Sequence, residues 1–395
     1  MGTKTKEGYR CALFDISAAS IGVALGSVNA DGARRIDWSK RIPFNTLEER
    51  AYSEYVKHCY AALMQAATTL SQEGMRAVPE GTYTARNLTV LARLSPPWMF
   101  GAPITAETKQ SERTTVTHSI LDKLRANAYE QVLALPEYTR WQEVVGSSVP
   151  VEQCDQILAL DGYHVTPGRS YVATTIELLH YVAFASPEVM EHIEEILHTA
   201  FPHSEVRFGT STRCFAQNLA PAPETLDARS LCIEVGGHTT TVSVVEEGVV
   251  HSTSALPEGL HDILRAAAPK AVSRLEAESA LEQTVPTADA EWETVPEPVR
   301  NELSEWHKGL QEAIKRATRG STPPLDTYLI VDQRYYPLFE HAAQMPWKQH
   351  GIRTLRSLVV HPYAIADSRI HEAGSNAHDM RLIALLDPVD ETTLH

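Results

Sequence analysis

The sequence predicts a large α/β protein built from two related halves that face a shared cleft. Its 395 residues, with 43% hydrophobic content, can bury a core divided over about two to four subdomains. Two stretches roughly half a chain apart, 11–32 and 231–248, each contain a strand, an acidic residue, a small turn and a second strand. A repeat of this kind favours a duplicated architecture.

The second stretch has the composition of a phosphate-binding hairpin. Alternating apolar residues from Leu231 to Val235 predict a strand, and Gly236-Gly237 permits a tight reversal. Backbone N–H groups of such a turn, together with the hydroxyls of residues 239–241, would hold a phosphate, and Glu234 would hold a magnesium ion through water. Taken alone, the same pattern is also that of an ordinary β-hairpin.

The first stretch repeats this order near the N-terminus. Asp15 occupies the position that Glu234 has in the second copy, and residues 17–20 form the small turn. Val23 and Leu25 lie on the returning strand, which ends at the polar bend 29–32.

These paired hairpins resemble the phosphate 1 and phosphate 2 motifs of the actin-like ATPase superfamily. The chain is similar in particular to the FtsA/PilM branch, that of a bacterial cell-division protein and a type IV pilus-assembly protein, over most of residues 10–370. The resemblance implies an actin-like (ribonuclease H-like) two-lobed α/β fold, with duplicated mixed sheets flanked by helices and a small inserted α+β subdomain.

The resemblance also implies where ATP and Mg²⁺ would bind. ATP would lie between the hairpins, with Mg²⁺ near Asp15 and Glu234. The implied phosphate-binding residues are Asp15, Ser17, Ala18, Ser20, Gly236, Gly237, His238, Thr239 and Thr240. Those implied on the adenosine and ribose side are Gly259, Glu278 and Asp332.

An inserted subdomain similar to that of FtsA is indicated by three consecutive features. These are the Asp161-Gly162 turn, a strand pattern at 171–185 and a helix pattern at 186–200, which begins with Ser186 as N-cap and Pro187. We therefore expect the first half of lobe I in residues 1–80, the insert and the return from it in 81–210, lobe II in 211–370 and an acidic tail in 371–395.

Hydrophobic periodicity predicts the remaining elements. We expect strands at 36–44, 88–94, 206–208, 249–255, 327–331 and 355–360, helices at 47–70, 115–135, 210–219, 299–317 and 335–343, and one or two helices at 259–280. Residues 72–74 are expected to end the first helix, and 282–298 to form an acidic surface loop. Trp98, which follows a strand and two prolines, is expected in the core rather than at a partner surface.

Several residues depart from the superfamily's pattern in ways that weaken a nucleotide site. Ser17 replaces a glycine, Glu234 replaces an aspartate, and residues 330–336 lack the glycines of the adenosine motif. Leu260 replaces a second glycine, and Leu281 replaces the ribose-contacting lysine. Because lost hydrogen bonds and clashes accumulate, we expect ATP to bind at millimolar concentration or more weakly.

Composition limits the partners and the cellular location. A net charge of −15 argues against a nucleic-acid partner and against direct attraction to anionic lipid. The five cysteines are far apart, which is typical of reduced core thiols, and the 17 histidines are too scattered to predict a further metal site. Without a signal peptide or an apolar run of membrane-spanning length, we expect a cytoplasmic protein.

We expect a non-catalytic or weakly nucleotide-binding scaffold of FtsA type that links a membrane-associated division machine to its partners and that forms homo-oligomers or filaments. The tail 377–395 is acidic rather than basic and amphipathic, so membrane recruitment would come through a partner's cytoplasmic segment. This favours, as an alternative, a PilM-like pilus-assembly scaffold. A further alternative is an active Mg-ATPase of the superfamily, in which Asp15 or Glu234 orients a water.

Overall fold

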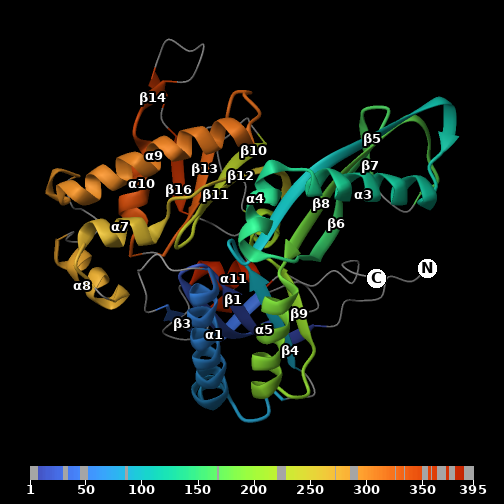
Figure 1. The fold of residues 1–395 in the computed structure, drawn as a ribbon. Coiled ribbons are helices and arrows are strands. Elements are labelled where there is room, and N and C mark those ends of the chain that lie inside the picture. Colours follow the sequence, from blue (N-terminus) through green and yellow to red (C-terminus); the bar gives the residue numbers. More distant parts are fainter. Residues whose placement is uncertain are drawn as a thin grey trace.

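Two mixed sheets with helices on their outer sides form the two lobes of the molecule, and a third sheet projects to one side of them (Figure 1). This arrangement comes from a computed structural model. It describes residues 8–29, 34–44, 52–84, 88–166, 169–219, 228–271, 273–284, 292–324, 326–332, 334–348, 355–356, 358–362, 371–372 and 379–386.

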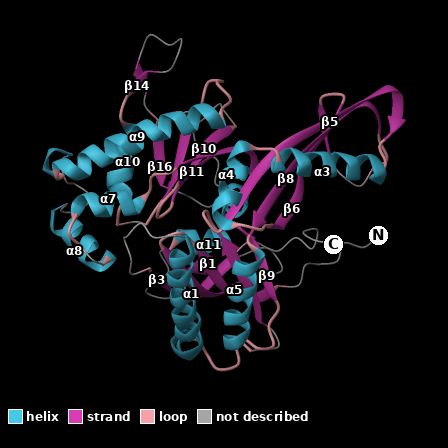
Figure 2. Cartoon of the chain, in the orientation of Figure 1, coloured by secondary structure: helices cyan, strands magenta, loops and turns pink. Residues whose placement is uncertain are grey.

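Lobe I is built on a six-stranded sheet. Its strands, in spatial order, are β17 (His371–Glu372), β3 (Arg34–Pro43), β2 (Ser20–Val28), β1 (Tyr9–Ile16), β4 (Leu88–Leu94) and β9 (Val206–Thr210). Helices α1 (Tyr52–Thr69) and α5 (Pro187–Ala200) lie side by side against one face of this sheet and bury their apolar sides in one core with it (Figure 2).

Lobe II is built on a five-stranded sheet. The order is β12 (Val249–Leu256), β11 (Thr240–Glu246), β10 (Arg229–Val235), β13 (Asp326–Ile330) and β16 (Val359–Pro362). Its own core is completed by α7 (Leu260–Ala267), α8 (Arg274–Thr284), α9 (Glu297–Ala317) and α10 (Tyr336–Gln344). The short strands β14 (Trp347–Lys348) and β15 (Leu355–Arg356) pair with each other outside this sheet.

The two sheets share one topology, which confirms the predicted duplication. In lobe I, β1 pairs antiparallel with β2 and parallel with β4. In lobe II, β10 pairs antiparallel with β11 and parallel with β13. Asp15 and Glu234 lie near the ends of the equivalent strands β1 and β10, so the duplicated hairpins bring the two acidic residues to equivalent positions.

The projecting sheet is inserted between β4 and α5 of lobe I. Its strands, in spatial order, are β5 (Met99–Thr115), β8 (Val172–Ala185), β6 (Val149–Leu160) and β7 (Tyr163–Val165), with α3 (His118–Leu133) and α4 (Pro136–Val145) packed on it. The expected segment 81–210 encloses this sheet, whereas β4, α5 and β9 at its ends belong to the sheet and core of lobe I. Strand β5 was not predicted, because its outer half is polar on both faces.

The predicted end of the first helix at residues 72–74 was wrong. The chain continues through a π-helical turn, Leu70–Gly74, into α2 (Met75–Ala77). Gly74 keeps right-handed helical angles, and a Cβ at this position would lie 2.9 Å from both Leu70 and Trp38. The glycine therefore permits close packing against Trp38 instead of ending the helix.

Two short helices fill the space between the lobes. They are α6 (Ser211–Asn218) and α11 (Met380–Leu385), and they pack in a common cluster with side chains from both sheets. Leu382 to Leu386 are almost completely buried. This part of the expected acidic tail is thus a core element, which hydrophobic periodicity did not reveal; residues 387–395 lie outside the described part of the chain.

Other expectations about burial are confirmed. Trp98 is fully buried, as expected for a core residue, and donates a hydrogen bond to the Ser17 carbonyl at 2.9 Å.

All five cysteines are free thiols. Four of them are buried, and Cys154 is partly buried. Among the helices that the structure describes, none is long and apolar enough to cross a membrane.

The burial of α11 predicts that the C-terminal region contributes to stability. Replacing Leu382 by Ala should lower the free energy of unfolding by about 2–5 kcal/mol, because it removes a fully buried side chain and leaves a cavity. The exposed Met64 on α1 provides the control, and Met64→Ala should change stability by no more than about 0.5 kcal/mol. Urea unfolding would measure both. Equal, small effects would show that α11 is not part of the core.

Candidate functional site

The acidic residues of the two hairpins, Asp15 and Glu234, share one arginine. Arg381 of α11 places Nε 2.6 Å from Asp15 Oδ2 and Nη2 2.6 Å from Glu234 Oε1. Asp15 has no exposed surface, and Glu234 is 6% exposed. The guanidinium, which also stacks over the Phe215 ring at 5.0 Å, therefore connects the two lobes at the position where the resemblance implied a magnesium ion.

A second arginine and two serines complete this network. Arg41 of β3 lies 3.0 Å from Asp15 and 2.7 Å from Asp379, the residue that caps the N-terminus of α11. Ser95 accepts a hydrogen bond from Arg381 at 2.7 Å and donates one to Ser211 at 2.8 Å. Ser211 in turn donates to the Glu234 carboxylate at 3.2 Å, so both acidic side chains have donors from several elements.

The charges of this network affect the ionisation of Asp15. Burial by itself would raise the pKa of this carboxyl, but the guanidiniums of Arg381 and Arg41 outweigh the burial and lower the pKa below its usual value of 3.8. Asp15 is therefore ionised near neutral pH. A buried carboxylate is stable in this state because its charge is matched by nearby cations.

The turns of the two hairpins are in direct contact. A Cβ on Gly237 would lie 2.9 Å from the Ala18 carbonyl oxygen in the other lobe. A Cβ on Gly259, before α7, would lie 2.6 Å from the carbonyl oxygens of both Gly236 and Gly237. The glycines thus allow three backbone segments to pack together, which takes up space where phosphate groups would have to enter.

Several polar groups of the turns are bonded within their own lobes. The backbone N–H groups of Ser17 and Gly236 donate to the carbonyls of Ser20 and Thr239. The Thr240 hydroxyl donates to the Glu258 carbonyl at 2.8 Å and accepts from Trp306 at 2.9 Å, inside the core of lobe II. Ser20 accepts from Arg41 at 3.0 Å. Several donors expected for phosphate therefore have internal partners.

His238 takes part in an aromatic contact between the lobes. Its ring meets the ring of Tyr55 from α1 edge-on at 5.0 Å, and its Nε2 lies 3.2 Å from Nδ1 of His261 on α7. Tyr55 stacks in turn on the buried Trp98 at 5.1 Å. Burial holds the pKa of His261 well below its usual value, and the adjacent His238 lowers it further, so the His261 ring is neutral near neutral pH.

The two acidic residues implied on the adenosine side are paired with arginines. Glu278 accepts from Arg274 at 2.6 Å, and Arg274 also donates across the lobe boundary to the Ala19 carbonyl. Asp332 accepts from Arg334 at 2.8 Å. The carboxylates of Glu278 and Asp332 are thus neutralised by arginines of the chain itself.

The arrangement does not fit Mg-ATP. A magnesium ion between Asp15 and Glu234 would meet the guanidinium of Arg381 at close range, and two cations repel each other strongly away from water. Triphosphate would meet the contact between Ala18 and Gly237. A nucleotide could enter only if Arg381 and the hairpin turns moved together.

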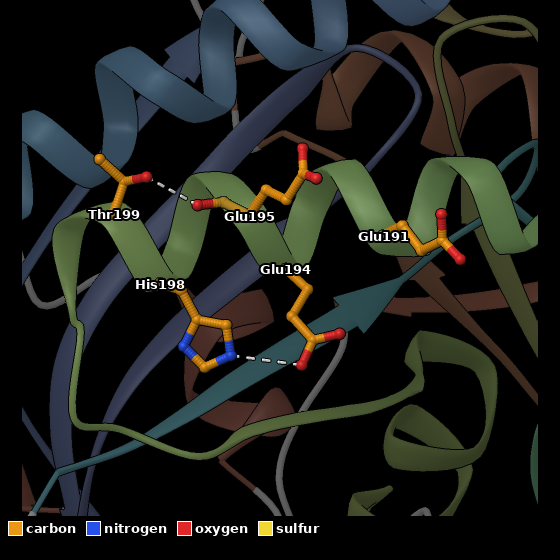
Figure 3. Close-up of a pocket in the computed structure, with 5 residues that line it drawn as sticks. All are labelled: Glu191, Glu194, Glu195, His198 and Thr199. Atoms are coloured by element: carbon orange, nitrogen blue, oxygen red, sulfur yellow. Dashed lines mark hydrogen bonds and ion pairs between the residues drawn. The ribbon is translucent and has the colours of Figure 1, made fainter.

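A shallow depression elsewhere on the surface does not add to this site. It lies on α5 and is lined by Glu191, Glu194, Glu195, His198 and Thr199 (Figure 3). The Glu194–His198 pair at 3.3 Å lies along the helix surface, and Thr199 donates to the Glu195 carbonyl. Among the described residues, no group of three or more His, Cys, Asp or Glu side chains could hold a metal ion.

The sequence indicated Asp15 and Glu234 but not the residues that bind them. These residues are far apart in the sequence and match no local motif: Arg41 on β3, Ser95 just after β4, Ser211 on α6 and Arg381 on α11. The sequence did contain one signal for Arg381, since this single arginine directly precedes the apolar run 382–386.

Comparison with known proteins identifies the fold. No family model matches the sequence, and no curated protein is detectably similar to it. A chain of the solved PilM–PilN type IV pilus biogenesis complex is 14% identical, with a TM-score of 0.58 over 96% of this chain and 94% of that one. The chain thus has the two-lobed fold of the actin-like ATPase superfamily, as predicted.

Two further solved structures that match have lower TM-scores. The ethanolamine utilization protein EutJ from Carboxydothermus hydrogenoformans is 13% identical, with a TM-score of 0.43 over 84% of this chain and 79% of that one. An exopolyphosphatase from Cytophaga hutchinsonii is 8% identical, with a TM-score of 0.34 over 82% and 67% of the two chains.

The shared guanidinium predicts a large and pH-dependent effect of Arg381→Met. The substitution leaves two buried carboxylates without their common cation, so the free energy of unfolding near neutral pH should fall by about 3–5 kcal/mol. The lowered pKa of Asp15 in the folded state means that this stabilisation is present above pH 3.8 and is lost as the pH falls below it.

Urea unfolding of both proteins near neutral pH and below pH 3.8 would measure the difference. The difference should shrink at the lower pH. Lys308→Met, which removes an exposed ion pair on α9, is the control and should have little effect. An Arg381→Met protein as stable as this control at neutral pH would contradict the assignment.

Proposed function

We propose that this protein is a non-catalytic actin-like scaffold whose lobes are held together by its own side chains instead of a nucleotide. The observation that carries the proposal is the guanidinium of Arg381 between Asp15 and Glu234. In this account the cation that neutralises the two hairpin carboxylates is covalently part of the chain. The lobes therefore keep one relative position whether or not ATP is present.

The contacts on either side of Arg381 support the same proposal. The Ala18–Gly237 approach occupies the phosphate side, and the Arg274–Glu278 pair, with its bond to Ala19, occupies the adenosine side. Displacing these contacts together with Arg381 would take an arginine away from three buried carboxylates, those of Asp15, Glu234 and Glu278. The binding energy of a nucleotide would have to offset that cost.

The charge of the chain supports a cytoplasmic partner of opposite sign. Cytoplasmic loops of inner-membrane proteins are enriched in Lys and Arg, and a chain with a net charge of −15 attracts such segments. We propose that the scaffold is recruited to the inner face of the membrane in this way.

The likeness in fold to a chain of the PilM–PilN type IV pilus biogenesis complex extends over 96% of this chain. This likeness supports a pilus-assembly role. The FtsA-type division role and self-association stay predictions.

Isothermal titration with Mg-ATP tests the proposal directly. We expect no binding at concentrations up to about 1 mM, corresponding to less than about 4 kcal/mol of affinity. Thermal unfolding with and without Mg-ATP provides a second measurement, since a ligand that binds only the folded state raises the melting temperature. Micromolar affinity would contradict the proposal. Phosphate release that is lost in Asp15→Asn would instead establish the ATPase alternative.

A further inference from the structure

Strand β6 of the inserted subdomain contacts both lobes of the molecule. Where the projecting sheet meets the two lobes (Figure 1), β6 lies beside β9 of lobe I and beside β12 of lobe II. Two of its side chains, Glu152 and Gln156, make polar contacts on these two sides. Because four residues of a strand span only about 13 Å, one short stretch of backbone joins both contacts.

The contact of Glu152 with lobe I is buried and charged. Glu152 is 4% exposed and accepts hydrogen bonds from the Thr210 hydroxyl at 2.6 Å and from the Thr210 N–H at 3.0 Å. The guanidinium of Arg213 on α6 bonds to its other carboxylate oxygen. We call these three residues the anchor. Breaking the anchor would leave a buried carboxylate without its cation, which is energetically costly.

The contact of Gln156 with lobe II is neutral and partly exposed. Its side-chain amide donates to the Val250 carbonyl at 2.9 Å and accepts from the Val250 N–H at 3.0 Å. Strand β12 is the outer strand of its sheet, so Gln156 bonds to main-chain groups that point away from β11. Since bonds between neutral groups are weaker than charge-assisted ones, the Gln156–Val250 pair, here called the latch, breaks more readily than the anchor.

Irregular pairing of β6 with β8 positions the side chain of Gln156. Asp155 pairs with His180 and Ile157 pairs with Leu179, so Gln156 is the extra residue of a β-bulge between them. A bulge interrupts the regular alternation of side chains and redirects the bulged residue. The latch therefore depends on a local feature of β6 that directs one amide toward the other lobe.

The space beside the latch is open. A groove of about 970 Å³ lies between the inserted subdomain and lobe II, and Gln156, Val249 and His251 are among the residues that line it. Close-packed side chains would resist a rotation of the subdomain, whereas an open groove does not. The groove therefore leaves room for the subdomain to move when the latch is broken.

We infer that the Gln156–Val250 pair is a releasable latch that sets the direction in which the inserted subdomain projects. With the latch closed, both lobes hold β6 in place. With the latch broken, the subdomain pivots about the anchor at Glu152, while Arg381 still connects the lobes. The inference goes beyond the proposed function, since it does not depend on whether a nucleotide binds.

Pulsed electron resonance on the full chain would test the latch. Spin labels at Tyr163→Cys on β7 and Leu275→Cys on α8 report on the subdomain and on lobe II, since both side chains are exposed. The labelled protein should give one narrow distance distribution, and Gln156→Ala should widen it at least about twofold because the latch is lost. Gln156→Glu should also widen it, because a carboxylate cannot donate to the Val250 carbonyl.

The matched control is Gln153→Ala, which truncates the same type of side chain on the same strand. Among the described residues, the Gln153 side chain has no hydrogen-bond partner, so the distribution should stay narrow. A second label pair, Met64→Cys on α1 with Leu275→Cys, reports on the lobes alone and should stay narrow in Gln156→Ala. The chain without added cysteines corrects for labelling of the partly buried Cys154.

A broad distribution in the chain with Gln156 intact, or no widening in either Gln156 variant, would overturn the inference. Equal widening in Gln153→Ala would overturn it as well. Widening of the second label pair in Gln156→Ala would show that Gln156 holds the lobes rather than the subdomain, which also contradicts it. Circular dichroism and thermal unfolding would establish that the variants fold. Titration with Mg-ATP tests the proposed function separately, so the two can fail independently.

Discussion

The guanidinium of Arg381 is the interaction on which the relation of the two lobes depends. Two buried carboxylates at equivalent positions of a duplicated sheet repel each other unless a cation lies between them. Here that cation is anchored by α11, whose apolar side chains are buried between the sheets. Because one helix supplies both the charge and the packing, removing either should disturb the other.

The contacts around this pair follow from the same constraint. Once the lobes are held at a short distance, glycine is required at 237, where the Ala18 carbonyl approaches closely. Tyr55 fills the remaining space by stacking on Trp98 and meeting His238 edge-on. Arg274 bonds to the facing turn through Ala19. The two lobes of this actin-like fold are thus connected by side chains of the chain itself.

Local signals in the sequence were sufficient for most elements and insufficient for the site. The hairpins, the start of α5 at Ser186-Pro187 and the burial of Trp98 follow from patterns within a few residues. Strand β5 lacks such a pattern because its outer half is solvated on both faces. The Arg381–Asp15 pair joins residues 366 positions apart, and only the folded chain brings them together.

The central claim is that the lobes keep one relative position without nucleotide, and an interlobe distance measures this directly. Spin labels at Met64→Cys on α1 and Leu275→Cys on α8 would report on lobe I and lobe II, since both side chains are exposed. Pulsed electron resonance should give one narrow distance distribution that Mg-ATP leaves unchanged. A second distance that grows with Mg-ATP concentration would contradict the account.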